Sequence, residues 1–559
     1  MKWTIQSLRE VGAFQWSILV LYGFSSLPWA WGNIGIILIA PKIPHWCQDY
    51  SPSFQNLTSE QQRQIMSSSE VCQRPDVNFT NLSSDELLTF NFSAVAWIDC
   101  DQGVSYDHSE FDYTATEQYN LGCGNEWMIS MANTVWMFGF FLAAATSGAI
   151  ADRFGRKTVM VGSGVLGGGA HLLASLAPPF TVFATGRFMA AMSVIAGYTG
   201  TTILSMELLR KNQRELTGVV LVFVGVISNT CFGAMAMVVR NHQHIQAIIS
   251  AFYMLGAVAN FCYMPESPRW LASQHRLDEA RAVVQRIATF NKESPDQLQH
   301  LLPADELQPE KIESEGRKTN ILDLFRTPTL RKRTIILCAM WFNLILVGYA
   351  LLFSLGDFGP DVRTSIMISA VLDLPALTLV MATVDRFGRQ VSAFSYMLLA
   401  GICCFAMAPL VGATGSPLLL TFALLGKLFS GIQFLIIYIY TPELYPTVIR
   451  TMGLGTSSTV ARVAGMLAPQ ITLLNRYWAP CMVVTLGTAG FISALLTPFL
   501  PDTTGHELPQ LLKEGENFQA DHRYRLVLPP DFKACKCAPK SEEVQTSREL
   551  KVMANDTSV

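Results

Sequence analysis

Long apolar runs recur along this chain of 559 residues and constrain its fold more than any other feature. Each run is close to the roughly 20 residues that a helix needs to cross the hydrocarbon layer of a bilayer. Lipid cannot hydrogen-bond an irregular backbone, so these segments must cross as helices. The sequence therefore predicts an all-α membrane protein with twelve transmembrane helices, at 15–40, 127–150, 158–177, 181–206, 216–239, 245–264, 334–355, 364–384, 391–413, 417–440, 452–474 and 478–500.

A short motif, DRFGR, occurs twice, and each copy lies between two predicted spans, at 152–156 and 385–389. Other matches between the halves occur at nearly the same offset. They are the pairs Glu207/Arg214 and Glu443/Arg450, the segments 265–267 and 501–503, and the segments 186–188 and 426–428. The chain is therefore predicted to be a duplication, folded as two pseudo-symmetric six-helix bundles. Such internal repeats are typical of secondary transporters.

Basic residues in the short loops predict the orientation of the chain. Arg and Lys gather in the loops after spans 2, 4, 8 and 10, and the positive-inside rule places these loops and both termini in the cytosol. The predicted parts are an N-terminal bundle at 1–264, an intracellular linker with short amphipathic helices at 265–333, a C-terminal bundle at 334–504 and a cytosolic tail at 505–559. We expect a multi-pass protein of the plasma membrane.

The segment 41–126, between the first two spans, is predicted to form a folded extracellular loop. It contains four N-glycosylation sequons, at Asn56, Asn78, Asn81 and Asn91. It also contains an even number of cysteines, at Cys47, Cys72, Cys100 and Cys123. Four cysteines outside the cell predict two disulfides with three possible pairings.

Acidic and basic residues gather at the cytosolic helix ends and predict a latch between helices. The residues are Asp152, Arg153, Arg156, Glu207, Arg214, Glu266, Arg269, Asp385, Arg386, Arg389, Glu443 and Arg450. Glu207 and Arg214, seven apart, are expected on one helix face, as are Glu443 and Arg450. We expect acid–base pairs when the inner face is closed and their separation when it opens. The alternative is that these charges only fix the topology.

These motifs resemble the major facilitator superfamily. GAIADRFGRK at 148–157, the repeated E-x6-R pairs and PESPRW at 265–270 are its marks, and PESPRW is shared with sugar porters. The cysteine-containing outer loop and YTPELYPTVIR at 440–450 resemble the polyspecific organic ion transporters of the solute carriers. The resemblance implies transport of organic cations, anions or zwitterions such as carnitine, by alternating access. A sugar-type porter and a non-transporting receptor on the same fold are weaker alternatives.

One arginine is predicted to lie near the middle of the membrane. Placing an ionisable side chain there costs free energy, so such a residue is a candidate for a functional role. Arg462 is near the middle of span 11, at a position that resembles Arg in anion and carnitine-type carriers of this family and Asp in its cation carriers. A guanidinium in a central cavity would bind a carboxylate. The alternative is that Arg462 pairs with Asp373 of span 8. Lys427 is expected to pair with an acid and to serve the architecture, as its counterpart Arg187 would.

Aromatic and amide side chains are the other predicted wall residues of the cavity. They are Tyr349, Tyr438, Asn33, Phe434 and Phe223, in addition to Arg462 and Asp373. Organic anions or zwitterions are favoured as substrates because of Arg462. Organic cations, held by aromatic faces and Asp373, are the alternative.

No enzyme is expected. GSGVLG at 162–167 spells a dinucleotide-binding pattern, but it lies inside an apolar span without a preceding strand. No nucleophile–base pair, cofactor or metal site is predicted, and a net charge of −3 argues against nucleic acid. The predicted partners are a small organic ion, the lipid bilayer and an undetermined counter-ion or exchanged anion.

Overall fold

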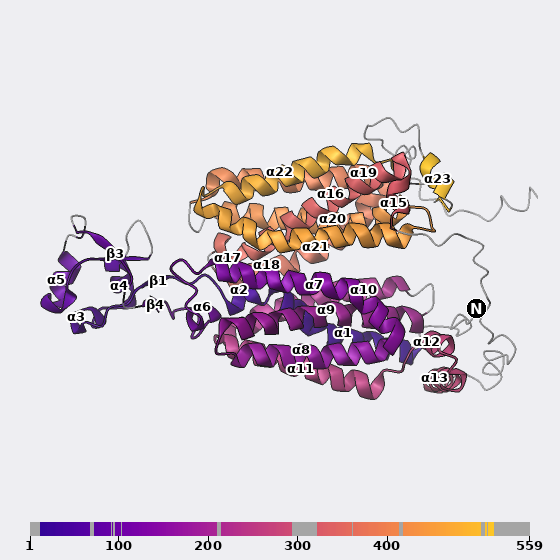
Figure 1. The fold of residues 1–559 in the computed structure, drawn as a ribbon, viewed down its shortest axis with the longest axis horizontal. Helices are drawn as coiled ribbons and strands as arrows, with labels where there is room; N and C mark the ends of the chain where they lie inside the picture. Colours follow the sequence, from indigo (N-terminus) through magenta and orange to yellow (C-terminus); the bar gives the residue numbers. More distant parts are fainter. Residues whose placement is uncertain are drawn as a thin grey trace, which may run out of the picture.

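We describe the protein from a computed structural model. It describes residues 12–66, 72–90, 92, 95–101, 103–209, 214–292, 321–359, 361–412, 417–504, 509–510 and 512–518. Long helices form two bundles that lie side by side, with a small separate domain at one end (Figure 1). We call the end with this domain the outer end and the end with the two DRFGR motifs the inner end.

The N-terminal bundle has six long helices. They are α1 (Ala13–Ile34), α7 (Trp127–Phe154), α8 (Arg156–Leu176), α9 (Phe180–Leu208), α10 (Arg214–Val238) and α11 (His242–Tyr263). Small residues let these helices approach closely: a Cβ at Gly164 of α8 would lie 2.9 Å from the Cβ of Ala257 on α11. The GSGVLG segment therefore serves helix packing.

The C-terminal bundle repeats this plan with one change. Its helices are α16 (Pro328–Phe353), α18 (Val362–Val371), α19 (Asp373–Met407), α20 (Pro417–Glu443), α21 (Arg450–Thr472) and α22 (Cys481–Leu496). Helix α19 is interrupted at Gly388, whose φ of 82° is not helical, so its two parts belong to different spans. The outer part of the eighth span is α18, a separate short helix, and this break before Asp373 was not predicted.

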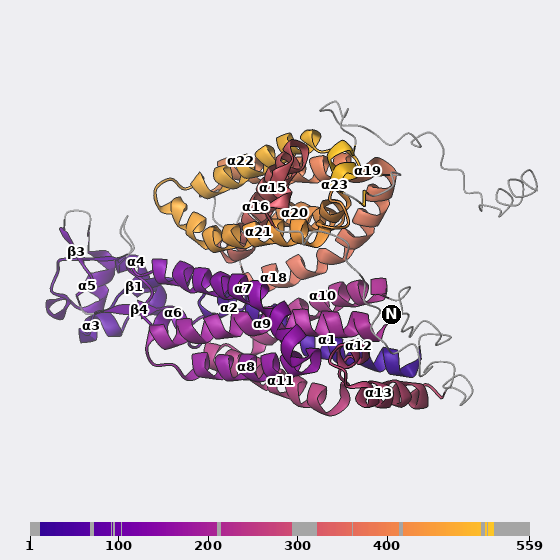
Figure 2. The same cartoon turned by 45° about the vertical axis from the view of Figure 1, so that its right-hand side comes forward.

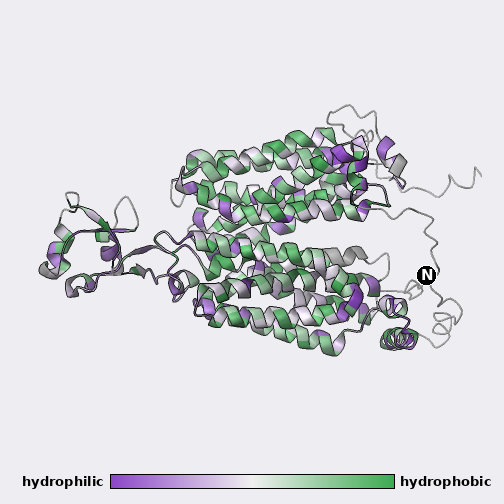
Figure 3. Cartoon of the chain, viewed as in Figure 1, coloured by the Kyte–Doolittle hydropathy of each residue, from purple (hydrophilic) through white to green (hydrophobic). Residues whose placement is uncertain are grey.

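Apolar residues cover the outside of both bundles (Figure 3). Eight segments of the described chain are long and apolar enough to cross a membrane, and Val362–Leu410 among them holds the eighth and ninth spans together. Many large apolar side chains there remain exposed, for example Val258, Phe261 and Met381. In a soluble protein such surfaces would be buried, so lipid is the environment that this exterior fits.

In the part of the chain that the structure describes, the main contacts between the two bundles lie toward their outer ends. Helix α7 packs on α21, and α10 packs on α18. The close contacts include Gly465 with Met137, and Gly233 with Met367. Toward the inner end the two bundles separate, as two views show (Figures 1 and 2).

The outer domain is a small, cross-linked unit. Strand β1 (His45–Cys47) pairs antiparallel with β4 (Val104–Tyr106), and β2 (Gln73–Pro75) pairs with β3 (Trp97–Asp99). Short helices surround them: α3 (Pro52–Gln55), α4 (Ser59–Met66), α5 (Ser84–Thr89) and α6 (Ala115–Gln118). The core includes Trp46, Phe54, Phe79 and Leu87. A domain with so small an apolar core needs covalent cross-links to stay folded.

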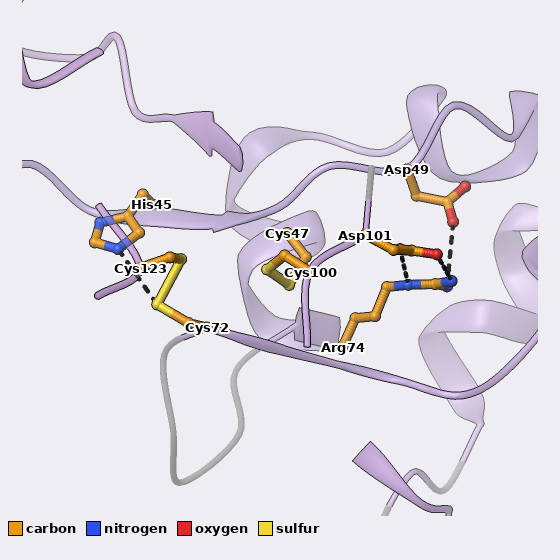
Figure 4. The surroundings of a disulfide bond; sticks show 8 residues. All are labelled: His45, Cys47, Asp49, Cys72, Arg74, Cys100, Asp101 and Cys123. Atoms are coloured by element: carbon orange, nitrogen blue, oxygen red, sulfur yellow. Dashed lines mark hydrogen bonds and ion pairs between the residues drawn. A yellow bond between two sulfur atoms is a disulfide. The ribbon is translucent and has the colours of Figure 1, made fainter. Parts of the chain in front are cut away.

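Two disulfides supply that support (Figure 4). Of the three pairings that the sequence allowed, the structure has Cys47–Cys100 and Cys72–Cys123. Cys47–Cys100 links the ends of β1 and β3, and Cys72–Cys123 links the β2 end of the domain to the segment that enters α7. Arg74 adds a bidentate contact to Asp101, at 2.7 and 2.8 Å.

Short helices at the inner end connect and cover the bundles. The predicted linker contains α12 (Pro268–Ser273), α13 (Leu277–Phe290) and α15 (Asp323–Arg326); residues 293–320 lie outside the described chain. Helix α13 rests on α1 through an edge contact of Phe290 with Phe14. The predicted tail contributes α23 (Leu512–Asn517), whose Glu516 accepts hydrogen bonds from the N–H groups of Thr329 and Leu330 at the start of α16.

Candidate functional site

The first DRFGR motif forms a tight corner at the inner end of the N-terminal bundle. Gly155 joins α7 to α8 with a φ of 98°, which favours glycine. The carboxylate of Glu266 accepts hydrogen bonds from the N–H groups of Arg156 (3.0 Å) and Lys157 (3.2 Å). The guanidinium of Arg156 then pairs with Glu207 of α9 at 3.4 Å. One acid thus caps the new helix and a second acid ties that helix to α9.

The second motif forms the same corner in the C-terminal bundle. Gly388 has a φ of 82°, and Asp502 accepts from the N–H groups of Arg389 (3.0 Å) and Gln390 (3.2 Å). The Arg389 guanidinium pairs with Glu443 of α20 at 3.3 Å. Each of these roles in the first corner therefore has a counterpart in the second.

These ion pairs lie within each bundle, and none among the described residues joins the inner ends of the two bundles. Arg156 and Arg389 remain paired although the inner ends are apart. The pairs therefore hold helices of one bundle together in this state. That they rearrange when the inner face closes stays a prediction.

The expectation that each Glu-x6-Arg pair shares one helix face is wrong. Glu207 lies in α9 and Arg214 begins α10, while Glu443 ends α20 and Arg450 begins α21. The chain leaves one helix and enters another between them, so a helical spacing rule does not apply. Arg450 donates to the backbone oxygen of Tyr445 at 3.4 Å. The side chain of Arg214 lies outside the described part of the structure.

The remaining predicted latch residues point to solvent. Arg153 and Arg386 are exposed and lie beside the rings of Phe154 and Phe387. Arg269 is exposed as well. Asp152 pairs with Arg156 at 2.9 Å, whereas its counterpart Asp385 is exposed and has no ion pair among the described residues. The two corners thus have equivalent helix caps, but the first aspartate of the motif is paired only in the first corner, within the described chain.

Between the bundles, at mid-height, lies a cavity of about 400 Å³. Six of the seven predicted substrate residues line it: Asn33, Tyr349, Asp373, Phe434, Tyr438 and Arg462. Both bundles contribute, since α1, α7 and α10 of the first face α16, α19, α20 and α21 of the second. A chamber enclosed by both halves is where an alternating-access carrier holds its substrate.

Phe223 is the predicted wall residue that the structure places elsewhere. Helix α10 turns Val222, Gly225 and Val226 toward the cavity, while Phe223 is 50% exposed on a face that it shares with Ile227. The prediction for Phe223 was wrong because an apolar helix does not reveal in its sequence which face meets the cavity and which meets lipid.

Arg462 of α21 lies on the cavity wall without an acidic partner among the described residues. Its guanidinium carbon is 5.8 Å from the centre of the Phe140 ring, which belongs to α7 of the other bundle. The alternative of a pair with Asp373 does not occur, because Asp373 pairs with Lys427 at 2.5 Å. Within the described chain, the cavity therefore has one cation that no carboxylate neutralises.

Three rings form an aromatic wall in the C-terminal bundle. The ring centres of Trp341 and Tyr438 are 4.8 Å apart, and those of Phe434 and Tyr438 are 4.9 Å apart. Their planes are steeply inclined, with interplanar angles of 74° and 65°. Trp341 is held by a hydrogen bond from its indole N–H to Thr441 at 2.9 Å. Such rings offer flat apolar area to planar or cationic groups.

Several wall residues were not predicted. They include Met137, Asn229, Trp341, Ser430, Ser458 and Lys427. Lys427 is the one with a usable sequence signal, because a lysine within an apolar span is costly unless it has a function or a partner. We expected it to serve the architecture alone, and it also faces the cavity.

A contact layer closes the cavity toward the outer end. The Thr134 hydroxyl of α7 donates to the Met466 carbonyl of α21 and accepts from the Gln470 amide, both at 3.0 Å. About one helical turn farther out, the same helices line a second cavity of about 560 Å³ through residues such as Ser130 and Pro469. The layer at Thr134 therefore separates an outer chamber from the central one.

Ion pairs at the outer surface reinforce this closure. Lys42 pairs with Asp357 of α17 (Leu355–Phe358) at 2.7 Å, and Arg363 donates to the Glu110 carbonyl at 3.3 Å. Asp361 orients Arg363 at 3.0 Å. Burial alone would raise the pKa of Asp361, but hydrogen bonds from Thr364 and Arg363 outweigh it and lower that pKa. The carboxylate thus stays charged at the start of α18.

The sequence profile of the family described as "Sugar (and other) transporter" matches residues 92–512. This protein belongs to that family. The relative "Organic cation transporter protein" of Drosophila melanogaster is 28% identical, with 92% of this chain and 94% of the relative covered. "Solute carrier family 22 member 6" of Rattus norvegicus is 28% identical, with 74% and 75% covered. "Solute carrier family 22 member 2" of Homo sapiens is 29% identical, with 72% and 71% covered.

Among solved structures, the chain is similar to the inward open conformation of the xylose transporter XylE from E. coli. The TM-score is 0.58 at 15% identity, over 90% of this chain and 99% of that chain. The crystal structure of a D-xylose-proton symporter gives 0.55 at 15% identity, over 89% and 100%. The predicted fold is confirmed: an all-α, multi-pass membrane protein with the major facilitator architecture. Its family is one of membrane transporters, which is not a class of enzymes.

Proposed function

We propose that this protein moves small organic monoanions or zwitterions across the plasma membrane by alternating access. The observation that carries the proposal is Arg462, a cation on the wall of a midplane cavity with no acid paired to it among the described residues. A carboxylate that binds there would form charge-assisted hydrogen bonds in a partly dehydrated chamber. The relative whose printed name is "Organic cation transporter protein" supports organic ions as the general substrate class, although that name specifies cations.

Rings on the wall of the cavity suit the organic part of such a substrate. Phe434 and Tyr438, packed on the buried ring of Trp341, form a surface that is rigid and mostly apolar. Phe434 and Tyr438 remain 36% and 38% exposed because they face the chamber. A flat substrate can therefore place its charge at Arg462 and its apolar body on these rings.

Organic cations are the second candidate for the substrate, because the same aromatic rings can also bind cations. A cation could lie on the exposed ring of Tyr438 or Phe434 and approach Asp373. Against this, Lys427 already occupies Asp373, and Arg462 would repel the cation. We therefore rank cations below monoanions and zwitterions.

The sidedness of the chain follows from the same proposal. The inner end faces the cytosol, with both termini there, and the outer domain faces the cell exterior. Asn56 and Asn78 are exposed as glycan acceptors must be, while Asn91 and the side chain of Asn81 lie outside the described part of the structure. A counter-ion or an exchanged anion is the proposed coupling partner.

Uptake of labelled benzoate by cells that express the full chain tests the proposal. Arg462→Gln should lower uptake about tenfold or more, because a charge-assisted hydrogen bond contributes roughly 1.5–3 kcal/mol. Arg281→Gln on α13 removes an arginine outside the cavity and should leave uptake unchanged. Equal benzoate uptake by Arg462→Gln and wild type, at equal surface amounts, would end the proposal, and uptake of labelled tetraethylammonium would then favour the cation alternative.

A further inference from the structure

Two opposite charges sit side by side on the cavity wall, apart from Arg462. The ammonium of Lys427 on α20 lies 2.5 Å from a carboxylate oxygen of Asp373 on α19. The side chains are 15% and 31% exposed, and both line the same chamber as Arg462. A substrate in the cavity can therefore reach either member of the pair.

Lys427 also has a partner outside the pair. The Lys427 ammonium donates to the backbone oxygen of Ser369, at 3.3 Å, near the C-terminal end of α18. Carbonyl groups at a helix C-terminus favour a cation. Asp373 is the first residue of α19, which follows α18 directly at Leu372. Lys427 thus keeps a hydrogen-bond partner when Asp373 is engaged elsewhere.

The matching residue of the other bundle shows that this placement is particular to the C-terminal half. Arg187 occupies the position in the N-terminal bundle that Lys427 occupies in the C-terminal one. Its side chain is only 1% exposed and lies over the Trp136 ring at 4.2 Å, away from the cavity lining. The pair of Lys427 and Asp373 is therefore not required by the duplicated architecture.

We propose that the Lys427–Asp373 pair is a second anchor for substrates bound at Arg462. Because it contains one positive and one negative group, it can bind a second charged group of either sign on the substrate. A zwitterion places its cationic group on Asp373 and displaces Lys427. A dianion places its second carboxylate on Lys427 and displaces Asp373. A monoanion leaves the pair intact. This inference rests on the proposed function, because it takes Arg462 as the first anchor.

The test compares uptake of glutarate, a dianion, with uptake of 4-(trimethylammonio)butyrate, a zwitterion, in cells that express the full chain. Asp373→Asn leaves a free lysine and should raise the ratio of dianion to zwitterion uptake about tenfold. Lys427→Gln leaves a free carboxylate and should lower the ratio about tenfold, since like charges in a dehydrated site repel strongly. Where direct uptake is too small to count, inhibition of benzoate uptake by each compound gives the same ratio.

The double variant Asp373→Asn with Lys427→Gln separates specificity from folding. It leaves no unpaired charge at positions 373 and 427, so it should reach the cell surface and keep a ratio within about threefold of wild type. Single variants that shift the ratio in the same direction, or a double variant that does not return toward wild type, would overturn the inference. If benzoate uptake persists and depends on Arg462 while the ratios stay unmoved, only the second anchor fails. If wild type takes up no benzoate, the proposed function itself fails.

Discussion

At their inner ends the two bundles are built alike, whereas at the midplane they differ. Gly155, Glu266 and Glu207 have the same roles in the first bundle as Gly388, Asp502 and Glu443 in the second. Within the bundles, Arg187 is sealed beside Trp136, while its counterpart Lys427 faces the cavity and pairs with Asp373.

This contrast separates what the duplication preserves from what the substrate requires. A tight corner needs a glycine with positive φ and an acid to accept the N–H groups of the next helix, in either half. The cavity wall has no such backbone requirement, so its side chains can diverge. The unpaired cation, the ion pair and the three packed rings all belong to the C-terminal bundle, so we infer that this half provides most of the recognition.

The largest expected effect comes from replacing the corner glycines. In Gly155→Ala and Gly388→Ala the new methyl group would overlap the carboxylate of Glu266 or Asp502. Positive φ costs about 1–2 kcal/mol, and the displaced cap adds about 1–3 kcal/mol. Both variants should lose stability to a similar degree, measured as melting temperature of the purified protein and amount at the cell surface. Gly162→Ala, where nothing lies within 4 Å, is the control; a large difference between the two corners would contradict their equivalence.

Arg187→Gln should have the next largest effect, and only on stability. The change removes the guanidinium contact with Trp136, for a loss of about 1–2 kcal/mol. Because Arg187 does not line the cavity, the ratio of dianion to zwitterion uptake should stay as in wild type. A ratio that moves as far as in Lys427→Gln would show that the two positions are functionally alike.

A substitution in the contact layer at Thr134 is expected to have a smaller effect, on the population of the outer-closed state. Thr134→Val removes both hydrogen bonds that join α7 to α21, each contributing about 0.5–1.5 kcal/mol. The outer-closed state should become several-fold less populated. A cysteine placed at Ser130, in the outer cavity, should then react faster with a membrane-impermeant thiol reagent.

The matched control for this layer is Thr185→Val. The Thr185 hydroxyl donates to the backbone oxygen of Thr181, within its own helix α9, so its loss should leave the contact between the bundles unchanged. The cysteine at Ser130 should therefore react at the wild-type rate in this variant. Equal reaction rates in the Thr134 and Thr185 variants would exclude a closing role for Thr134.

The smallest expected effect is the difference in stability between the Asp152→Asn and Asp385→Asn variants. Asp152 pairs with Arg156 but is 73% exposed, so Asp152→Asn should cost less than about 1 kcal/mol. Asp385→Asn should cost nothing measurable in this state, since Asp385 has no ion pair in the described part of the chain. Melting temperatures of the two variants at low salt would check the order, and a larger loss for Asp385→Asn would reverse it.

Much of the fold could be predicted because it depends on local patterns. Apolar length predicts spans, the repeated DRFGR motif predicts two similar turns between spans, and the matched segments 265–267 and 501–503 predict that residues 266 and 502 correspond. The break before Asp373, the face of Phe223 and the choice among three disulfide pairings depend on tertiary packing. Arg462 could be singled out because a charge in a span is costly. Lys427 was assigned to architecture by its match with Arg187, and only the structure shows that the two differ.

The most direct measurement is a cryo-electron microscopy map of the full chain with bound benzoate. We predict density for the carboxylate within hydrogen-bond distance of the Arg462 guanidinium, between the two bundles, with the benzoate ring on Phe434 or Tyr438. A map in which Arg462 faces lipid or is sealed in protein, or in which benzoate lies outside this cavity, would contradict the proposed site.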